Sequence, residues 1–202
     1  MTNLEDQEIK VILVGETGTG KTSLINITMD LKFNEGEEAS TSAASFVTKK
    51  MKIGDKEYSI NLWDTIGQER FRSLTKIFIK DSKIVIFVYD ITRLDTFKEL
   101  EFWFKTIHDV LGDEPVLGIV GNKKDLIMKE QVSEEKAEKY AEEKNVPFKL
   151  TTAKNPFGFK SFLEDLLKKY IEKTGGVVES SEGKKLEDNK NNNKNGKGKK
   201  WC

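Results

Sequence analysis

The sequence predicts an α/β fold with a mostly parallel β-sheet, and two observations support this. Short apolar runs that are rich in β-branched residues recur along the chain, which is typical of strands buried on both faces. The segments between these runs carry apolar residues at intervals of three and four, as on one face of a helix. Because strands that alternate with helices favour parallel pairing, we expect a sheet covered by helices on both faces.

Six strands are expected, and one of them is antiparallel to its neighbour. Residues 46–53 and 57–63 flank the turn Gly54-Asp55-Lys56, which predicts a hairpin and hence one antiparallel strand at the edge of the sheet. The other four strands are expected at 9–14, 84–89, 116–120 and 147–150.

Helical spacing marks the connecting segments. Apolar residues at intervals of three and four predict a single helix over 97–111 and another over 159–170. An amphipathic segment at 24–31 predicts a helix directly after the first strand. Ser133 precedes two glutamates, a pattern typical of the capped start of a helix.

The chain divides into a folded part and two polar ends. We expect one domain over residues 8–173, because 202 residues suffice for one domain with a tail. Residues 189–200 contain only lysine, asparagine and glycine, which cannot bury enough apolar surface to offset the entropy of ordering. We therefore expect a disordered, hypervariable tail at 174–202, and a flexible N-terminus at 1–7.

The composition excludes several classes of function. Lysine plus arginine equals aspartate plus glutamate at 34 each, so no basic excess points to a nucleic-acid partner, and none is expected. The single cysteine rules out a disulfide framework within the chain and fits a reducing compartment. The N-terminus is acidic, unlike a targeting peptide, and no apolar run approaches the ~20 residues that cross a bilayer. We therefore expect a cytoplasmic protein.

A glycine-rich stretch, GETGTGKTS, follows the first expected strand and precedes a helix. It contains the pattern G-x-x-x-x-G-K-[ST], in which glycines tolerate positive φ and let backbone N–H groups surround phosphate oxygens. Lys21 would reach the β- and γ-phosphates of a nucleoside triphosphate, and the Thr22 hydroxyl would bind Mg²⁺. The strand–helix context disfavours the alternative, a turn that binds nothing. The stretch predicts the P-loop NTPase fold, with a nucleotide bound by Gly15, Glu16, Thr17, Gly18, Thr19, Gly20, Lys21, Thr22 and Ser23.

The residues that follow the strand at 116–120 indicate which base is bound. Asn122, Lys123 and Asp125 form the pattern N-K-x-D at the carboxyl end of that strand, where ligands of such sheets bind. The Asp125 carboxylate can accept hydrogen bonds from the N1–H and the exocyclic N2–H of guanine. Adenine lacks this pair of donors and would leave the carboxylate unpaired. The aliphatic stem of Lys123 can lie against the base, so the stretch predicts guanine.

A third polar stretch, Asp64 to Gln68, follows the strand that ends at residue 63. Asp64 can hold Mg²⁺ through a water molecule, and the N–H of Gly67 can contact a γ-phosphate. Gln68 can orient the water molecule that attacks the γ-phosphate. In isolation, a polar turn after a strand would explain the same residues.

Together, GETGTGKT, DTIGQERF, GNKKD and TTAK resemble the motifs of the small GTPases of the Ras superfamily. WDTIGQERFRSL and VYDIT resemble the Rab branch most, and the resemblance covers about residues 8–173. It implies a Mg²⁺-dependent switch between GTP and GDP that hydrolyses GTP slowly and regulates vesicle traffic. It also implies that Lys21, Gly67 and Gln68 are the catalytic residues.

The resemblance adds residues to the expected site. In the family, a threonine of the first switch binds Mg²⁺, and counting back from Trp63 places it at Thr41, which we favour. Counting forward from Lys21 gives Ser40 instead. Phe33 matches the aromatic residue that stacks on guanine, although a core residue at a helix end would have the same character. The loop that backs the base through main-chain contacts is matched by Thr152, Ala153 and Lys154.

Two departures from the family pattern keep a rival function open. Ser42-Ala43-Ala44-Ser45-Phe46 replaces I-G-x-D-F, and Ile66 replaces the alanine of D-T-A-G-Q. The larger side chain beside Gly67 would hinder the N–H of that glycine from meeting the γ-phosphate, and hydrolysis would then be impaired. The rival is a pseudo-GTPase adaptor that binds nucleotide with little hydrolysis. A metabolic P-loop kinase is disfavoured because the sequence shows neither a second substrate-binding lid nor an arginine-rich insert, whereas N-K-x-D is present.

The resemblance also implies protein partners and a membrane. Exchange factors, GTPase-activating proteins and effectors would act on a monomer through its two switches. Cys202 matches neither C-a-a-X nor a double-cysteine ending, but a prenyl chain there, beside the lysine-rich tail, would supply two anchoring signals. The prenylated protein would bind a GDP-dissociation inhibitor and cycle to the cytosolic face of an intracellular membrane. The alternative is an unmodified thiol.

Overall fold

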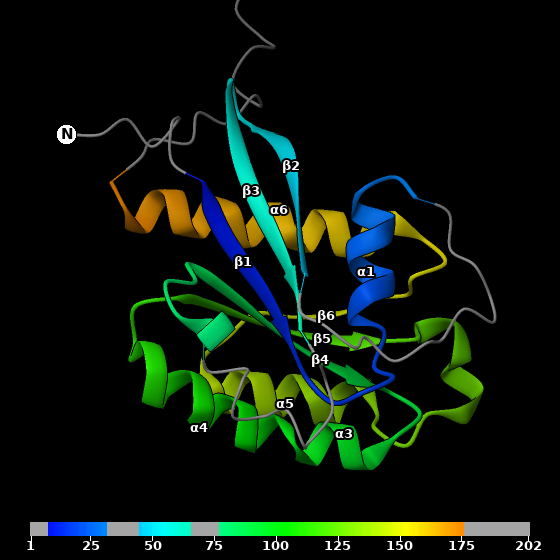
Figure 1. Ribbon diagram of the computed structural model, residues 1–202. Helices are drawn as coiled ribbons and strands as arrows, with labels where there is room; N and C mark the ends of the chain where they lie inside the picture. The colour runs from blue at the N-terminus through cyan, green and yellow to red at the C-terminus, as the bar shows by residue number, and fades with distance from the viewer. Residues whose placement is uncertain (1–7, 32–44, 66–76, 176–202) are drawn as a thin grey trace, which may run out of the picture.

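The computed structural model describes residues 8–31, 45–65 and 77–175, which build a six-stranded sheet between two layers of helices (Figure 1). The strand order is β2-β3-β1-β4-β5-β6. β2 and β3 pair antiparallel, and every other neighbouring pair is parallel. The predicted α/β fold with one antiparallel edge strand is confirmed. The strands are β1 (Ile9–Val14), β2 (Ser45–Ile53), β3 (Lys56–Asp64), β4 (Ile84–Asp90), β5 (Val116–Asn122) and β6 (Phe148–Leu150).

The helices differ from the sequence prediction in two places. The single helix expected over 97–111 begins earlier and is divided at Glu99, which keeps right-handed helical angles (φ −70°, ψ −10°). Hydrogen bonds cross the junction, from Glu99 N to Asp95 O and from Trp103 N to Glu99 O, so the apolar stripe continues. The short 3₁₀ helix η3 was not predicted. The helices are α1 (Lys21–Thr28), α3 (Leu94–Lys98), α4 (Leu100–Leu111), η3 (Lys124–Lys129), α5 (Glu134–Lys144) and α6 (Pro156–Lys173).

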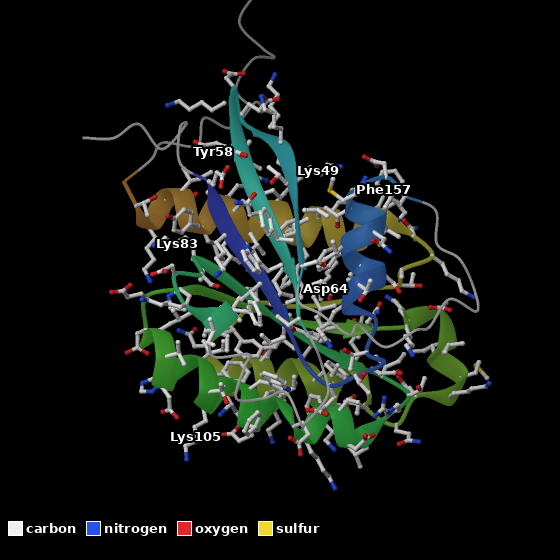
Figure 2. The ribbon with its side chains drawn as sticks, viewed as in Figure 1. Lys49, Tyr58, Asp64, Lys83, Lys105 and Phe157 are labelled. Atoms are coloured by element: carbon white, nitrogen blue, oxygen red, sulfur yellow. The ribbon has the colours of Figure 1, made fainter. Side chains whose placement is uncertain are left out.

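The two faces of the sheet bury separate apolar clusters, since neighbouring residues of a strand point to opposite faces. Leu13 on β1 packs with residues of α1 and α6, whereas Ile12 packs with residues of α4 and α5. Figure 1 shows α1 and α6 on one side of the sheet and α3, α4 and α5 on the other. Charged side chains such as Lys83 and Lys105 point outward (Figure 2). Helices therefore cover both faces, as predicted.

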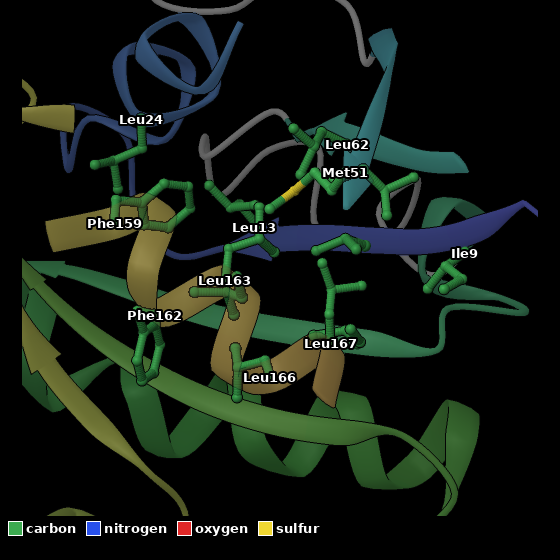
Figure 3. Close-up of a cluster of buried hydrophobic side chains, with 14 of the residues drawn as sticks. Ile9, Leu13, Leu24, Met51, Leu62, Phe159, Phe162, Leu163, Leu166 and Leu167 are labelled. Carbon is green, nitrogen blue, oxygen red and sulfur yellow. The ribbon is translucent and has the colours of Figure 1, made fainter. Parts of the chain in front are cut away.

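The cluster under α6 is continuous from the helix to the central strand. Figure 3 shows Leu163 of α6 directed at Leu13 of β1, with Leu24 of α1 and Phe159 beside them. These four side chains are fully buried. Burying a leucine or phenylalanine in this way stabilises a fold by about 1.5–3 kcal/mol each. This packing fixes α1 against β1, and so fixes the loop that joins them.

Parallel pairing brings the carboxyl ends of four strands to one edge of the sheet. Leu13 pairs with Asp64, and Asp90 pairs with Asn122. Three of these end residues are polar and buried, at 6% exposure for Asp64 and 1% each for Asp90 and Asn122. Buried polar groups require partners, so this edge is where a functional site is expected. Within the described residues, no helix has both the length and the apolar character needed to cross a bilayer.

Candidate nucleotide-binding site

The loop between β1 and α1 adopts a conformation that its glycines make possible. Gly15 has φ 147° and Gly20 has φ 90°, in the region that residues with a Cβ rarely occupy. A Cβ on Gly15 would lie 2.1 Å from the carbonyl oxygen of Val88, and one on Gly20 would lie 2.3 Å from the side-chain nitrogen of Asn122. The glycines therefore let the loop pass close to the ends of β4 and β5.

Lys21, the first residue of α1, turns back onto this loop. Its side chain is buried, and Nζ donates hydrogen bonds to the carbonyl oxygens of Gly15 at 2.8 Å and Glu16 at 2.9 Å. Burial lowers the pKa of Lys21 to about 8, against the opposing effect of the negative charges on Asp64 and Glu16. The arrangement places an ammonium group inside a ring of backbone, where it can meet a phosphate oxygen.

A hydroxyl and a carboxylate meet beside Lys21. The Oγ1 atom of Thr22 donates a hydrogen bond of 2.6 Å to Oδ2 of Asp64, which lies at the end of β3 next to the first turn of α1 (Figure 2). Hydroxyl and carboxylate oxygens are the hard donors that Mg²⁺ prefers, usually together with water and substrate phosphates. The donor set at this position therefore fits a magnesium ion.

Asn122 connects the glycine-rich loop to the opposite part of the site. Its side chain is buried, and Nδ2 donates a hydrogen bond of 2.9 Å to the carbonyl oxygen of Thr19. Its Oδ1 accepts from Oγ1 of Thr151 at 3.5 Å. Asn122 therefore joins three segments of the chain, which are the glycine-rich loop, the end of β5 and the residues after β6.

Asp125 lies at the start of η3 and is oriented by residues that follow β6. Thr152 Oγ1 donates a 2.6 Å hydrogen bond to Oδ1 of Asp125, and Lys154 Nζ lies 3.4 Å from Oδ2. Burial opposes ionisation of Asp125, but the Thr152 hydrogen bond, a backbone hydrogen bond and Lys154 hold its pKa below the usual range. An ionised carboxylate only accepts hydrogen bonds, which suits a ligand edge with two donors.

Asp90, the last residue of β4, and Arg93, just beyond it, also reach the site, and sequence reasoning missed both. The Oδ2 atom of Asp90 lies 3.0 Å from Lys123 Nζ, and Arg93 Nη1 donates a 2.9 Å hydrogen bond to the carbonyl oxygen of Thr17. The available signal was positional. Asp90 directly follows the apolar run 84–89 and therefore ends a strand at the functional edge, as Asp64 and Asn122 do.

The structure brings together one group of the expected site residues, and the others lie outside its described residues. The residues brought to the carboxyl edge of the sheet are Gly15, Glu16, Thr17, Gly18, Thr19, Gly20, Lys21, Thr22, Ser23, Asp64, Asn122, Lys123, Asp125, Thr152, Ala153 and Lys154. The expected residues that lie outside the described ones are Phe33, Ser40, Thr41, Ile66, Gly67, Gln68 and Cys202.

The fold, with its glycine-rich loop between β1 and α1 and a lysine turned back onto that loop, defines a P-loop nucleotide-binding protein. A profile of the Ras family matches residues 10–172. The chain is 44% identical over 174 residues to Ras-related protein Rab-21 of Bos taurus and to that of Homo sapiens. Each alignment covers 86% of this chain, together with 78% of the Bos taurus protein and 76% of the Homo sapiens protein. It is 43% identical over 163 residues to Ras-related protein Rab-21 of Geodia cydonium, and this alignment covers 81% of this chain and 71% of that relative. The chain belongs to the Ras family and is a small GTPase of the Rab type.

Proposed function

We propose that this protein is a GTP-binding and GTP-hydrolysing switch that regulates vesicle traffic through effectors which bind its GTP form. One observation carries the proposal. Lys21, the Thr22–Asp64 pair and Asp125 converge on the carboxyl edge of one sheet, where Asn122 ties the loops that carry them. A cation, a pair of hard oxygen donors and an acceptor-only carboxylate match the phosphates, the metal and the base of a guanine nucleotide.

The phosphates would be held by backbone and by one ammonium group. The N–H groups from Gly15 to Ser23 would surround the β-phosphate at the N-terminus of α1, where the helix dipole favours an anion. Lys21 would contact the β- and γ-phosphates. Magnesium would be held by Thr22 and Thr41 directly and by Asp64 through water, and it would neutralise phosphate charge.

The base would be selected by a carboxylate. Asp125 would accept hydrogen bonds from both N1–H and N2–H of guanine, while the stem of Lys123 and the aromatic ring of Phe33 would pack on the base. Main-chain groups of Thr152, Ala153 and Lys154 would line its edge. Adenine has no matching pair of donors, so both hydrogen bonds from the base to Asp125 would be lost, at a cost of about 1.5–3 kcal/mol each for bonds to a charged group.

Hydrolysis would be slow in the isolated protein. Gln68 would orient the attacking water, the N–H of Gly67 would contact the γ-phosphate, and Lys21 would stabilise the charge that develops in the transition state. An arginine supplied by an activating protein raises the rate of such enzymes by about 10³–10⁵. The protein would therefore need an activating protein to end its signal and an exchange factor to renew it.

The ends of the chain would connect the switch to a membrane. Residues 8–173 would form the GTPase domain, and residues 174–202 the tail that carries Cys202. Prenylation of Cys202, together with the nearby lysines, would hold the monomeric protein on the cytosolic face of an intracellular membrane. A GDP-dissociation inhibitor would return the prenylated form to the cytoplasm.

A second function is favoured by one specific observation, the isoleucine at position 66 in place of the family's alanine. A pseudo-GTPase adaptor would bind GTP and keep it. Its effectors would then recognise a permanently loaded protein.

One experiment on the purified full-length chain separates these functions. The protein is denatured, the released nucleotide is identified, and fresh protein is loaded with GTP and Mg²⁺ so that phosphate release can be followed over a single turnover. We expect about one GDP per chain and slow hydrolysis. Retained GTP without hydrolysis would establish the adaptor, and the absence of guanine nucleotide would refute both functions.

The base selectivity has a direct test. Inosine diphosphate lacks the exocyclic amino group, so one of the two hydrogen bonds to Asp125 is lost. We expect it to bind about tenfold or more weakly than GDP, and we expect Asp125→Ala to remove most of that difference. Equal affinity of the unaltered protein for the two nucleotides would contradict the role of Asp125.

A further inference from the structure

We infer that the segment from Asp90, the last residue of β4, to Arg93 is a positioning element of the nucleotide site. Asp90 holds Lys123 in place against the base, and Arg93 holds the glycine-rich loop at Thr17. The inference rests on the proposed function, since it concerns how the same site retains its nucleotide. Neither residue belongs to the four motifs that predicted the site.

Asp90 is a buried carboxylate with fixed partners at both oxygens. Its side chain is 1% exposed, and Oδ2 lies 3.0 Å from the ammonium group of Lys123. Its Oδ1 accepts hydrogen bonds from the N–H of Thr92 at 2.9 Å and from the Thr92 hydroxyl at 2.7 Å. A buried carboxylate is costly unless it is paired, so the ion pair with Lys123 is kept closed. The carboxylate has no freedom to swing away.

The ion pair constrains a lysine that is already in an unusual conformation. Lys123 has φ 68°, a left-handed angle that costs a residue with a Cβ about 1–2 kcal/mol. Its side chain is 24% exposed, so part of it stays open to a ligand while Asp90 holds the ammonium group. The stem is then available as a flat apolar surface, with its rotamer already selected.

Arg93 makes the corresponding contact with the phosphate side. Its Nη1 donates a 2.9 Å hydrogen bond to the carbonyl oxygen of Thr17, and its Nη2 donates a 2.8 Å bond to Oδ2 of Asp95. A Cβ on Gly18 would lie only 3.4 Å from Nη1, so the guanidinium lies directly against the loop. The rigid fork of arginine suits a contact that must fix two acceptors at once.

The segment is itself rigid enough to transmit position. Thr96, which is 1% exposed, accepts a hydrogen bond of 3.0 Å from the N–H of Asp90 and donates one of 2.8 Å to the carbonyl oxygen of Arg93. The N–H of Ile91 donates to the carbonyl oxygen of Asn122 at 3.2 Å. Hydrogen bonds within the segment and to Asn122 therefore hold it in place at the end of β5.

The site consequently has two internal connections between its base side and its phosphate side. The direct one runs from Asn122 to Thr19, and the second runs from Lys123 through residues 90–93 to Thr17. Loosening the second connection leaves every group that touches the nucleotide in the protein. It lets these groups move relative to one another, so the nucleotide should dissociate faster while the chemistry of hydrolysis is unchanged.

The test uses the full-length protein loaded with a fluorescent GDP analogue, whose release is followed after an excess of GDP is added. Asp90→Asn keeps the shape of the side chain and removes its charge, and we expect release to become about tenfold faster. Arg93→Gln should give about a threefold increase, and Arg93→Lys, which keeps one donor and the charge, should restore most of it. Glu101→Gln removes a surface ion pair with Lys144 far from the site and should leave release unchanged.

A double substitution distinguishes positioning from general loss of structure. If Asp90 acts through Lys123, Asp90→Asn combined with Lys123→Met releases the analogue no faster than Lys123→Met alone. If Asp90 only supports the fold, the two effects multiply, and the inference is wrong. Release from Arg93→Gln at the unaltered rate would also overturn it, and this holds even if Asp90→Asn does not fold. Failure of the unaltered protein to hold any guanine nucleotide would instead refute the proposed function.

Discussion

The phosphate side and the base side of the site are built in different ways. On the phosphate side, the side chains of Lys21 and Thr19 bond carbonyl oxygens no more than six residues away, such as Lys21 Nζ to that of Gly15, and Arg93 adds one contact from a distant part of the chain. On the base side, Thr152 contacts Asp125 across 27 residues, and Asn122 contacts Thr19 across 103. The phosphate side is mainly a local turn, and the base side is assembled by the topology of the sheet.

This difference decides how each side responds to change. A local turn depends on backbone conformation, so it fails abruptly when one residue cannot adopt the required angles. An assembled site depends on several separate hydrogen bonds, so the loss of one weakens it by a limited amount. Substitutions on the two sides should therefore differ in size and in kind.

The largest effect is expected from Gly15→Ala. The new Cβ would lie 2.1 Å from the carbonyl oxygen of Val88, and two backbone segments cannot separate without opening the pairing of β1 with β4. We expect a loss of more than about 4 kcal/mol in the free energy of unfolding, and no bound nucleotide. Thermal unfolding and the nucleotide content of purified protein measure both.

Gly112→Ala is the matched control for Gly15→Ala. Gly112 also has a positive φ, 61°, but a Cβ there meets no atom within 4 Å. Its ψ of −141° places it outside the left-handed helical region, in backbone that is nearly exclusive to glycine, so Gly112→Ala should lose about 1–3 kcal/mol and keep its nucleotide. Equal stability of the two variants would show that the close approach of the loop to β4 is not required.

The next largest effect is expected from Lys21→Met, which separates binding from stability. The substitution removes the ammonium group that would contact the phosphates, so the Kd for GDP should rise about 100-fold or more. The stability of the nucleotide-free protein should change by less than about 2 kcal/mol, because the loss of two hydrogen bonds is offset by removal of a buried charge. Titration with GDP and urea unfolding give the two quantities.

Lys173→Met is the control for Lys21→Met. Lys173 also donates to two backbone carbonyl oxygens, those of Asp113 and Glu114, but it lies at the exposed end of α6. Its substitution should leave the Kd for GDP unchanged. An affinity of Lys21→Met within tenfold of the unaltered protein would contradict a phosphate role for Lys21.

The same difference explains what the sequence could predict. The glycine-rich loop follows from spacing, because its glycines and Lys21 are neighbours in the chain. The mostly parallel sheet follows from the apolar runs that alternate with helical spacing, and Asp125 follows from its place after a strand. The place of Asp90 after an apolar run was a signal of the same kind, but its contact with Lys123 forms only when β4 and β5 pair, and that of Arg93 with Thr17 only when β1 and β4 pair. The division at Glu99 was missed because the apolar spacing continues across it.

Asn122→Ala tests the assembled side, where a smaller effect is expected. It removes the 2.9 Å hydrogen bond to the carbonyl oxygen of Thr19 and leaves that buried acceptor without its partner. We expect a loss of about 1–3 kcal/mol in stability and about tenfold in GDP affinity. Urea unfolding and fluorescence titration with GDP measure them.

Asn61→Ala provides the comparison for Asn122→Ala. Asn61 is also buried, and its side chain bonds Glu8 and Thr48 on the β3 side of the sheet, away from the nucleotide site. Its substitution should lower stability by a similar amount and leave GDP affinity unaltered. If Asn122→Ala also left affinity unaltered, the two sides of the site would be independent of each other.

The smallest effect is a dependence on pH that originates on the phosphate side. Burial lowers the pKa of Lys21 to about 8 in the nucleotide-free protein, and phosphate oxygens beside the ammonium group would raise it again. Above pH 8, binding of GDP must therefore be accompanied by uptake of a proton, and affinity must fall as the pH rises. With a pKa of about 8, uptake should increase from about a tenth of a proton at pH about 7 to about three quarters at pH about 8.5, and affinity should fall about fourfold.

Calorimetry of GDP binding in two buffers of different ionisation enthalpy measures the uptake. Uptake that does not change between these pH values would show that Lys21 is already charged before the phosphates arrive, and that the loop holds its ammonium group without help from the ligand.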